Sequence, residues 1–561
     1  MQADSRKIIS ENIVADRSKL KIICVFLHRI YFGRIPYERQ YRGKKRKAMN
    51  ITELQQSYAS HPNVEGVCRL LKDNSVRHLY CGGLYASAAS LFSSVLVQRA
   101  TCPLVFILGD MEEAGYFYHD LTQILGTEQV LFFPSSFRRA IKYGQKDAAN
   151  EILRTEVLSR LQKGEEGLCV VTYPDALAEK VVSRKELGEN TLKLHAGERV
   201  DMNFVTDVLR SYGFEYVDYV YEPGQYAVRG SIIDVFSFSS EYPFRIDFFG
   251  DEVESVRTFE VETQLSKEKK ESIVIVPDLS HSLEKKGSGG MVSFLDFLPS
   301  DSLLAMRDFL WLRERIQTVH DESLTPQAIA ARESEENGAI TLEGKLIDGG
   351  EFTLRALDFR RMEFGNKPTG TPDATVSFHT TVQPIFHKNF DMVAESFREY
   401  LSRHYTIYIC SDSLKQTDRI RAIFEDRGDN ISFTAVERTL HEGFADDTLR
   451  ICVFTDHQLF DRFHKYNLKS DKARSGKVAL SLKELNQFTP GDYVVHTDHG
   501  VGRFAGLVRI PNGDTTQEVM KIVYQNEDVV FVSIHSLHKV SKYKGKEGVN
   551  KTLSCSMPDY R

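Results

Sequence analysis

The stretch Gly491-Asp-Tyr-Val-Val-His-Thr-Asp-His-Gly-Val-Gly-Arg-Phe-Ala-Gly-Leu507 decides the fold of the C-terminal part of the chain. Its β-branched and aromatic residues predict a strand at Tyr493–His496, followed by a turn and a second strand over Val501–Ile510. Two further strands, Glu518–Tyr524 and Val529–Ile534, follow after polar turns. Short strands separated by turns predict a small β-barrel, which is suited to presenting an edge strand to a partner.

The composition of the whole chain is typical of a multidomain globular protein. Its 561 residues correspond to about three to five domains of ordinary size. Hydrophobic residues make up 42% and charged residues 27%, and no apolar run approaches the roughly eighteen residues needed to cross a bilayer. We therefore expect a cytoplasmic protein with no membrane partner.

The cysteines carry no metal-ligand spacing. None of them forms a Cys-x-x-Cys pair or combines with histidine at zinc-site spacing, and several lie in apolar runs, so we interpret them as reduced core residues. The eight residues are Cys24, Cys68, Cys81, Cys102, Cys169, Cys410, Cys452 and Cys555.

The net charge of −6 is unevenly distributed. Residues 1–50 contain thirteen Lys and Arg against four Asp and Glu, a net of +9, which leaves −15 for the remainder. The net negative charge of residues 51–561 disfavours DNA binding by phosphate neutralisation and favours protein partners. The basic segment is either a nucleic-acid-binding arm or, in the interpretation we prefer, a disordered or mis-assigned leader over residues 1–48, with the functional chain starting at Met49.

Residues 49–190 alternate short apolar runs with helical stretches such as Glu112–Leu125, which predicts a parallel sheet covered by helices. The predicted strands are Val76–Cys81, Cys102–Leu108, Val130–Phe133 and Leu168–Thr172. The first strand runs into Cys81-Gly-Gly-Leu-Tyr-Ala-Ser-Ala-Ala-Ser90, at the place of a phosphate-binding loop. A P-loop needs a lysine for the phosphates, and this segment contains neither Lys nor Arg. We interpret Gly82 and Gly83 as a tight turn in a degenerate P-loop-like domain and expect no cofactor there.

Residues 191–275 show the two-residue alternation of an antiparallel domain inserted into the α/β domain, which resumes over residues 276–330. The predicted strands are Tyr216–Tyr221, Tyr226–Val228, Ser231–Phe238, Phe244–Phe249 and Glu252–Phe259. The acidic residues near the last turn are metal ligands or, as we prefer, parts of a solvated hairpin; they are Asp247, Asp251, Glu252 and Glu254. The only tryptophan, Trp311, lies in the resumed part, where we interpret it as a packing residue.

Two motifs of the inserted domain resemble a known family. Residues 224–236 read Gly-Gln-Tyr-Ala-Val-Arg-Gly-Ser-Ile-Ile-Asp-Val-Phe, and residues 242–252 read Tyr-Pro-Phe-Arg-Ile-Asp-Phe-Phe-Gly-Asp-Glu. They resemble the UvrA-binding domain shared by UvrB and the bacterial transcription-repair coupling factors (Mfd). The resemblance implies a UvrA-binding surface that includes Tyr226, Arg229 and Phe236. The residues alone leave an alternative open, in which Phe236 belongs to the core and Arg229 pairs with Asp234.

A linker is predicted over residues 331–374, a second small α/β domain over 375–470 and another linker over 471–485. The strands expected in the second α/β domain are Thr381–Pro384, Thr406–Ser411, Ile431–Thr434 and Arg450–Thr455. His457 and His464 have no ligand partners in sequence, so we interpret both as ordinary surface or core residues. This domain resembles the third, non-catalytic domain of the coupling factors.

Residues 486–561 resemble the RNA polymerase-interacting domain of the coupling factors, which CarD-type transcription regulators share, because every position of the Val494–Gly506 motif is filled. The resemblance implies an SH3/CarD-like barrel whose exposed strand pairs with a strand of the polymerase β subunit. It places the contacts on Leu507, Val508 and Ile510, with Arg503 and Arg509 as charges at the rim. His496, Asp498 and His499 are better explained as turn residues than as metal ligands.

The resemblance extends over residues 49–543 and predicts an N-terminal part of a coupling factor that binds RNA polymerase and UvrA. The 561 residues contain no GxxxxGK(S/T) motif, so we expect neither catalysis nor cofactors from them. The resemblance assigns ATP, magnesium and double-stranded DNA to the translocase of the full-length family, which displaces a stalled polymerase and recruits nucleotide excision repair. Two alternatives stay open, a UvrB-like damage-verifying ATPase and a CarD-like regulator.

Overall fold

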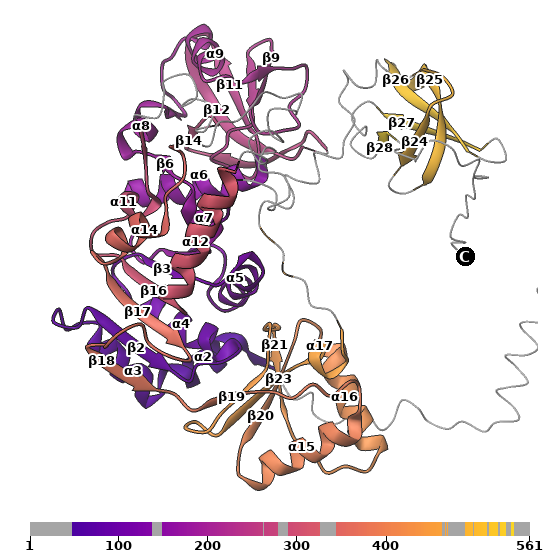
Figure 1. The fold of residues 1–561 in the computed structure, drawn as a ribbon. Helices are drawn as coiled ribbons and strands as arrows, with labels where there is room; N and C mark the ends of the chain where they lie inside the picture. Colours follow the sequence, from indigo (N-terminus) through magenta and orange to yellow (C-terminus); the bar gives the residue numbers. More distant parts are fainter. Residues whose placement is uncertain are drawn as a thin grey trace, which may run out of the picture. The chain divides into compact units, whose positions relative to one another are not determined.

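The computed structural model describes most of the chain between residues 48 and 542. The described residues are 48–136, 148–261, 263–278, 290–325, 344–462, 466, 468, 489–496, 499–512, 515–524, 528–533 and 540–542. The predicted leader up to residue 47, the predicted linker over 471–485, His464 and Asp498 therefore lie outside the described residues. Figure 1 shows the described segments as four parts, each containing its own main sheet.

The first α/β domain is built on a seven-stranded sheet in which every neighbouring pair of strands is parallel, as predicted. In sheet order the strands are β18 (Ala374–Ser377), β2 (His78–Gly82), β17 (Arg360–Gly365), β16 (Leu303–Met306), β3 (Leu104–Ile107), β5 (Cys169–Thr172) and β4 (Val130–Phe133). Every residue of β3, β4 and β5 is buried, because helices cover both faces of the sheet.

The helices of this domain begin and end at recognisable signals. In α5 (Met111–Leu125) the Asp110 side chain accepts hydrogen bonds from the first-turn amides of Glu112 and Glu113, both at 2.9 Å, and Gly126 follows with a φ of +84°. The others are α2 (Ile51–Ala59), α3 (Pro62–Leu70), α4 (Ser87–Arg99), α6 (Ala148–Lys163), α7 (Pro174–Ala178), α8 (Arg184–Glu189), α11 (Phe294–Phe297), α12 (Phe309–Ser323) and α14 (Gly349–Ala356). Trp311, predicted as a packing residue, is instead 44% exposed on α12.

The linker prediction for residues 331–374 fails in its second half. Helix α14 and strand β17 both belong to the first α/β domain, and β17 lies between β2 and β16 in the middle of the sheet. The charged residues of β17 interrupt the apolar run by which a buried strand is recognised in a sequence. Arg360 donates hydrogen bonds to backbone carbonyls at the base of the sheet, and the fully buried Glu363 lies 3.2 Å from the imidazole of His78 on β2. Partnered charges can thus occupy a central strand.

The inserted domain carries a six-stranded sheet packed on α9 (Met202–Ser211). In order its strands are β13 (Ser266–Lys270), β12 (Glu252–Phe259), β11 (Phe244–Phe249), β10 (Ile232–Val235), β9 (Gln225–Arg229) and β8 (Glu215–Tyr216). All pairings are antiparallel, as predicted, except the short parallel pair β8–β9. Two small antiparallel pairs join this domain to the chain around it: β7 (Leu192–His195) with β14 (Ser272–Ile275), and β6 (Val181–Val182) with β15 (Met291–Val292).

The second α/β domain has a mixed sheet, whereas the sequence predicts a parallel one. In order its strands are β1 (Met49–Asn50), β21 (Thr434–Glu437), β20 (Thr406–Ser411), β23 (Ile451–Thr455), β22 (Phe444–Asp446) and β19 (Thr380–Val382). The first four run parallel, β22 runs antiparallel to its neighbour β23, and β19 pairs antiparallel with β22. The reason is the tight turn after β22, where Asp446 accepts hydrogen bonds from the amides of Thr448 and Leu449. The helices are α15 (Phe390–Ser402), α16 (Leu414–Asp426) and α17 (Asp456–Leu459).

The C-terminal sheet domain is a five-stranded antiparallel sheet. In order its strands are β27 (Val529–Ser533), β26 (Thr515–Val523), β25 (Gly500–Asn512), β24 (Tyr493–His496) and β28 (Val540–Lys542). A separate apolar core that includes Val494, Phe504 and Ile522 lies on one face. Among the described residues β27 and β28 are the two edge strands and do not pair with each other.

Candidate functional site

The sheet of the inserted domain has one apolar face and one polar face. On the apolar face, Tyr226, Ile233 and Ile246 join a core beneath α9. Many of the residues that alternate with them along the same strands carry charges on the opposite face, beside a smaller apolar cluster that includes Ala227 and Phe236. The charged residues of this face are Arg229, Asp234, Arg245, Asp247 and Arg257.

The structure places two of the three predicted UvrA-binding residues in the interior. Tyr226 is 3% exposed and Phe236 only 1%. Arg229 keeps about a third of its side chain exposed, pairs with Asp234 and lies over the ring of Tyr219, with 5.1 Å between the guanidinium carbon and the ring centroid. This arrangement matches the alternative in which Phe236 is a core residue and Arg229 pairs with Asp234. Only Arg229 of the three can touch a partner directly.

Ion pairs with aspartates hold the arginines of this polar face in place. Asp234 is almost fully buried. Its carboxylate accepts a hydrogen bond from Arg229 on one side and, on the other, from the Nε and Nη2 atoms of Arg245 at 2.7 and 2.9 Å. Hydrogen bonding to Asp234 raises the pKa of Arg245. Arg257 pairs with Asp247, which also accepts the Ser255 hydroxyl at 2.7 Å. The face therefore presents guanidinium groups in fixed positions, a geometry suited to binding carboxylates on a protein partner.

Phe249 was missed in the sequence analysis and is the most exposed large apolar residue of the inserted domain. Its side chain is 79% exposed, whereas the neighbouring Phe248 is buried. Phe249 ends β11 directly before Gly250, which turns the chain with a φ of +61°. The doubled phenylalanine was a usable signal, because strand alternation forces one of two adjacent residues onto the outer face. An exposed aromatic ring that ends the strand carrying Arg245 is the kind of side chain that anchors protein-binding hot spots.

Strand β25 of the C-terminal sheet domain leaves one edge unpaired. It pairs with β24 only over Gly500–Arg503, whereas β26 pairs with it as far as Asn512. Phe504 adds backbone hydrogen bonds to Gly491 and Asp492, both at 2.8 Å. Beyond Phe504, none of the described strands pairs with this edge. An additional strand from a partner can therefore continue the line of β24.

A β-bulge separates the paired and unpaired halves of β25. The register shifts between Phe504 and Leu507, and Gly506 within the bulge has a φ of +105°. Leu507 is 38% exposed, Val508 is half-buried and Arg503 is exposed. Arg509 and Ile510 are paired by register with Glu518 and Gln517, but their side chains lie outside the described part of the structure. The predicted contact residues thus share one strand.

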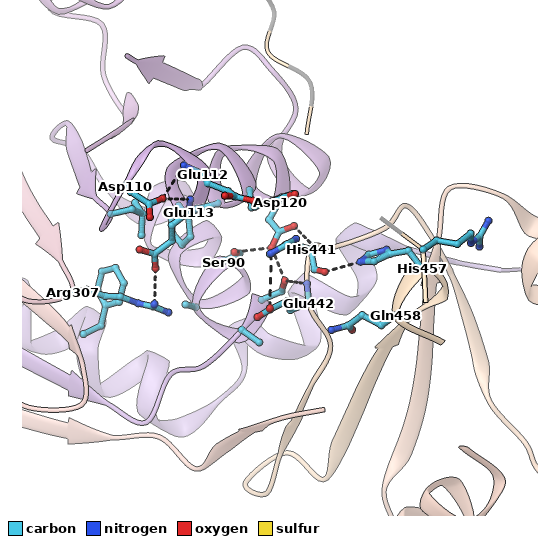
Figure 2. A pocket seen from close by; sticks show the side chains of 18 residues that line it. Ser90, Asp110, Glu112, Glu113, Asp120, Arg307, His441, Glu442, His457 and Gln458 are labelled. Carbon is cyan, nitrogen blue, oxygen red and sulfur yellow. Dashed lines mark hydrogen bonds and ion pairs between the residues drawn. The ribbon is translucent and has the colours of Figure 1, made fainter. Parts of the chain in front are cut away.

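The predicted tight turn at Gly82 and Gly83 is present at the carboxyl end of β2. Gly83 has a φ of +76°, and a Cβ atom there would lie 2.1 Å from the carbonyl oxygen of Phe378, so only glycine fits. A cleft of about 570 Å³, which we call the loop cleft, opens beside this turn and α4. Figure 2 shows that its labelled side chains come from both α/β domains. They include Ser90, Asp120, Arg307, His441 and Glu442.

Carboxylates dominate the loop cleft. Arg307 is held by Glu113 at 2.6 Å, and Arg462 by Asp456 at 2.9 Å. Asp120 is buried, and that burial raises its pKa to about 7. No lysine is present among the described residues that line the cleft. The surroundings of the turn are therefore unfavourable for a polyphosphate.

Two family models match parts of this chain. Residues 192–281 match the UvrB interaction domain, which is the inserted domain with its polar face. Residues 488–544 match the CarD-like/TRCF RID domain, which is the C-terminal sheet domain. The chain thus combines two protein-interaction modules with two α/β domains.

The chain is also similar to bacterial transcription-repair-coupling factors. It is 22% identical over 549 residues to the protein from Bacillus subtilis strain 168, covering 84% of this chain and 45% of the relative. It is 24% identical over 536 residues to the protein from Staphylococcus aureus strain RF122 and 23% over 537 residues to that from strain USA300, each covering 84% of this chain and 46% of the relative. The chain spans about half the length of the curated relatives it matches.

Among the described residues, no group of three or more His, Cys, Asp or Glu side chains could hold a metal ion. His457 is buried and its ring lies 2.8 Å from the carbonyl oxygen of His441, as expected for an ordinary core histidine. No helix in the described ranges is long and apolar enough to span a membrane.

Proposed function

We propose that this chain is the part of a transcription-repair coupling factor that connects UvrA to RNA polymerase. The observation that carries this proposal is the presence in one chain of two matched interaction modules, each with an exposed surface of the right kind. The inserted domain presents ordered arginines and Phe249, and the C-terminal sheet domain presents the unpaired edge of β25.

The UvrA-binding surface consists of Arg229 and Phe249, with the mostly buried Arg245 holding Asp234 in place beneath Arg229. The Arg229 guanidinium group offers donors to acidic residues of UvrA, and the exposed ring offers an apolar anchor. Tyr226 and Phe236, which the resemblance implied as contacts, support the surface from within the domain.

The polymerase-binding surface is the half of β25 beyond the bulge. A strand of the polymerase β subunit adds to its free edge through main-chain hydrogen bonds. Leu507, Val508 and Ile510 supply apolar contacts, and Arg503 and Arg509 supply charges at the rim. The bend at Gly506 directs this half of the strand away from β24. Closure of the sheet into an SH3-like barrel belongs to this proposal.

These residues catalyse no reaction and bind no nucleotide in our proposal. The absence of lysine from the glycine turn and the acidic loop cleft support it. ATP, magnesium, double-stranded DNA and the displacement of a stalled polymerase belong to the translocase of the full-length family, and the complex acts in the cytoplasm. Titration with Mg-ATP tests this point, because micromolar affinity would instead favour a UvrB-like ATPase.

Two substitutions separate the two binding surfaces. Phe249→Ala should weaken UvrA binding by roughly thirtyfold and spare RNA polymerase, because it removes an exposed anchor. Ile510→Arg should abolish polymerase binding and spare UvrA, because strand addition would bury an unpaired charge. Both are measured by binding of the full chain to purified UvrA and to purified polymerase.

Matched controls exist on both domains. Phe204→Ala removes another half-exposed ring from the inserted domain, and Val529→Arg adds a charge to the opposite edge strand of the C-terminal sheet. Both controls should retain binding.

If the unmodified chain bound neither protein, the bridging proposal would be wrong. Binding of polymerase alone would favour the CarD-like regulator.

A further inference from the structure

A turn of the second α/β domain reaches the N-terminus of α4, beside the glycine turn. The backbone amide of Glu442 donates a hydrogen bond to the Ser87 hydroxyl at 3.0 Å. In return, the first amide of α4, that of Ser87, donates to the carbonyl oxygen of Glu442 at 3.4 Å. In nucleotide-binding proteins, amides at this position of the fold donate to phosphate oxygens. Here an oxygen of the chain itself accepts the hydrogen bond.

The neighbouring residue, His441, fixes the turn to α5. Its imidazole stacks on the ring of Tyr116, with 3.6 Å between centroids and 11° between planes. Its backbone amide donates to Asp120 at 2.7 Å. The other carboxylate oxygen of Asp120 accepts the hydroxyls of Ser87 and Ser90 at 2.6 and 2.9 Å. Asp120 thereby joins α4, α5 and the turn, as Figure 2 shows.

The backbone before α4 has a conformation that needs such support. Ala86 has φ +50° and ψ −147°, a combination that residues other than glycine rarely adopt, and its side chain makes no capping hydrogen bond. Strained positions of this kind persist only where the surrounding structure holds them in place. The reciprocal hydrogen bonds between Ser87 and Glu442 supply part of that support.

A second set of contacts holds the far end of β22. The fully buried Asp446 accepts the hydroxyl of Tyr58 at 3.0 Å and lies 3.5 Å from the imidazole of His61, both from the first α/β domain. At the opposite edge of the same sheet, β1, which directly precedes α2 of the first domain, pairs with β21. The segment between β21 and the end of β22 is therefore attached to the first domain at both ends.

We propose that the His441–Glu442 turn occupies the loop cleft and thereby latches the second α/β domain onto the first without any nucleotide. The glycine turn and the N-terminus of α4 have the arrangement of a phosphate-binding loop. The group that contacts them is a segment of the same chain, where a nucleotide-binding protein would hold a phosphate. The two α/β domains consequently move as one body. The latch involves neither UvrA nor polymerase and does not depend on binding of either.

Hydrogen exchange of the full chain tests the latch. The variant Ser87→Ala/His441→Ala removes the hydroxyl and the stacked ring. We expect exchange in peptides covering residues 85–90 and 438–446 to become about tenfold faster, while peptides of β11 and β12 in the inserted domain stay unchanged. Ala86→Gly is the matched control in the same loop, and because it only relieves strain, exchange there should be unchanged or slower.

Unchanged exchange at both segments in the double variant would overturn the proposal, as would acceleration at 85–90 without acceleration at 438–446. If the double variant unfolds, β11 and β12 will also exchange faster. His441→Ala alone then decides the question, because it deletes one surface ring and leaves the backbone contacts. A latch predicts a smaller acceleration at both segments with this variant, and an identical profile to the unmodified chain would refute it.

Discussion

At the scale of single residues, Asp120 shows how burial changes the chemistry of a side chain. Burial raises its pKa to about 7 from an ordinary value of 3.8, and the Glu442 carboxylate adds to this effect, whereas hydrogen bonds from Ser87, His441 and Ser90 oppose it. The folded chain therefore keeps a proton that the unfolded chain has released. Because the folded state binds more protons between about pH 4 and pH 7, the free energy of unfolding falls as the pH rises through this range.

Asp120→Asn should remove this pH dependence. The amide keeps one oxygen as an acceptor but does not titrate. We expect the unmodified chain to lose stability relative to the variant between pH 5 and pH 7, with the difference levelling off above the pKa of Asp120. Urea unfolding of both proteins at four pH values, followed by circular dichroism, measures this. Parallel stability profiles would show that Asp120 is not responsible.

At the scale of elements, the outer face of the inserted sheet depends on one carboxylate. Asp234 is 1% exposed and forms ion pairs with two arginines on the neighbouring strands, Arg229 and Arg245. The side chain of Arg245 is itself mostly buried. Removal of Asp234 leaves the guanidinium of Arg245 without its paired carboxylate, with only the Gln264 carbonyl still accepting a hydrogen bond from it. A buried charge without its partner costs far more than the pair contributes.

Asp234→Ala should lower the stability of the inserted domain by roughly 3 kcal/mol. Glu254→Ala, at an exposed position of β12, should change it by less than about 0.5 kcal/mol. The strands β9 to β12 report the effect through native-state hydrogen exchange. Equal effects of the two substitutions would mean that the arginines are solvated well enough to need no partner.

In the whole molecule, one face of the second α/β domain's sheet belongs to the hydrophobic core of the first domain, while its other face has an apolar cluster of its own that includes Ile407 and Phe454. Val436 and Phe444 of the second domain belong to the same apolar cluster as Leu54 and Tyr58 of the first. The C-terminal sheet domain has its own cluster. Domains that share a core are expected to unfold together, whereas a separate core can unfold alone.

Val436→Ala should therefore destabilise both α/β domains together, by about 2 kcal/mol. Val494→Ala, which is equally buried in the C-terminal sheet domain, should affect only that domain. Differential scanning calorimetry combined with domain-resolved hydrogen exchange distinguishes these outcomes. Independent melting of the second α/β domain would contradict a shared core.

Local patterns in the sequence were sufficient to predict many of the longer strands. Val130–Phe133, Phe244–Phe249, Glu252–Phe259, Thr406–Ser411 and Tyr493–His496 are strands with the predicted bounds. These segments have a clear alternation or a continuous apolar run, and their side chains carry the information. Strand β17 and the antiparallel β22 were not predictable, because buried charges and a tight turn override the local pattern.

The motifs of the inserted domain and of the C-terminal sheet domain are contiguous and each spans one or two strands, so the sequence alone was enough to recognise both domains. Only the tertiary structure decided which of their residues are accessible: Phe236 is buried, Phe249 is exposed, and β25 leaves an edge open beyond β24. It also decided what fills the loop cleft, because His441 and Ser87 lie far apart in the chain and meet only through packing. Which side of a strand faces solvent, and which distant segment covers a turn, depend on contacts that no local pattern contains.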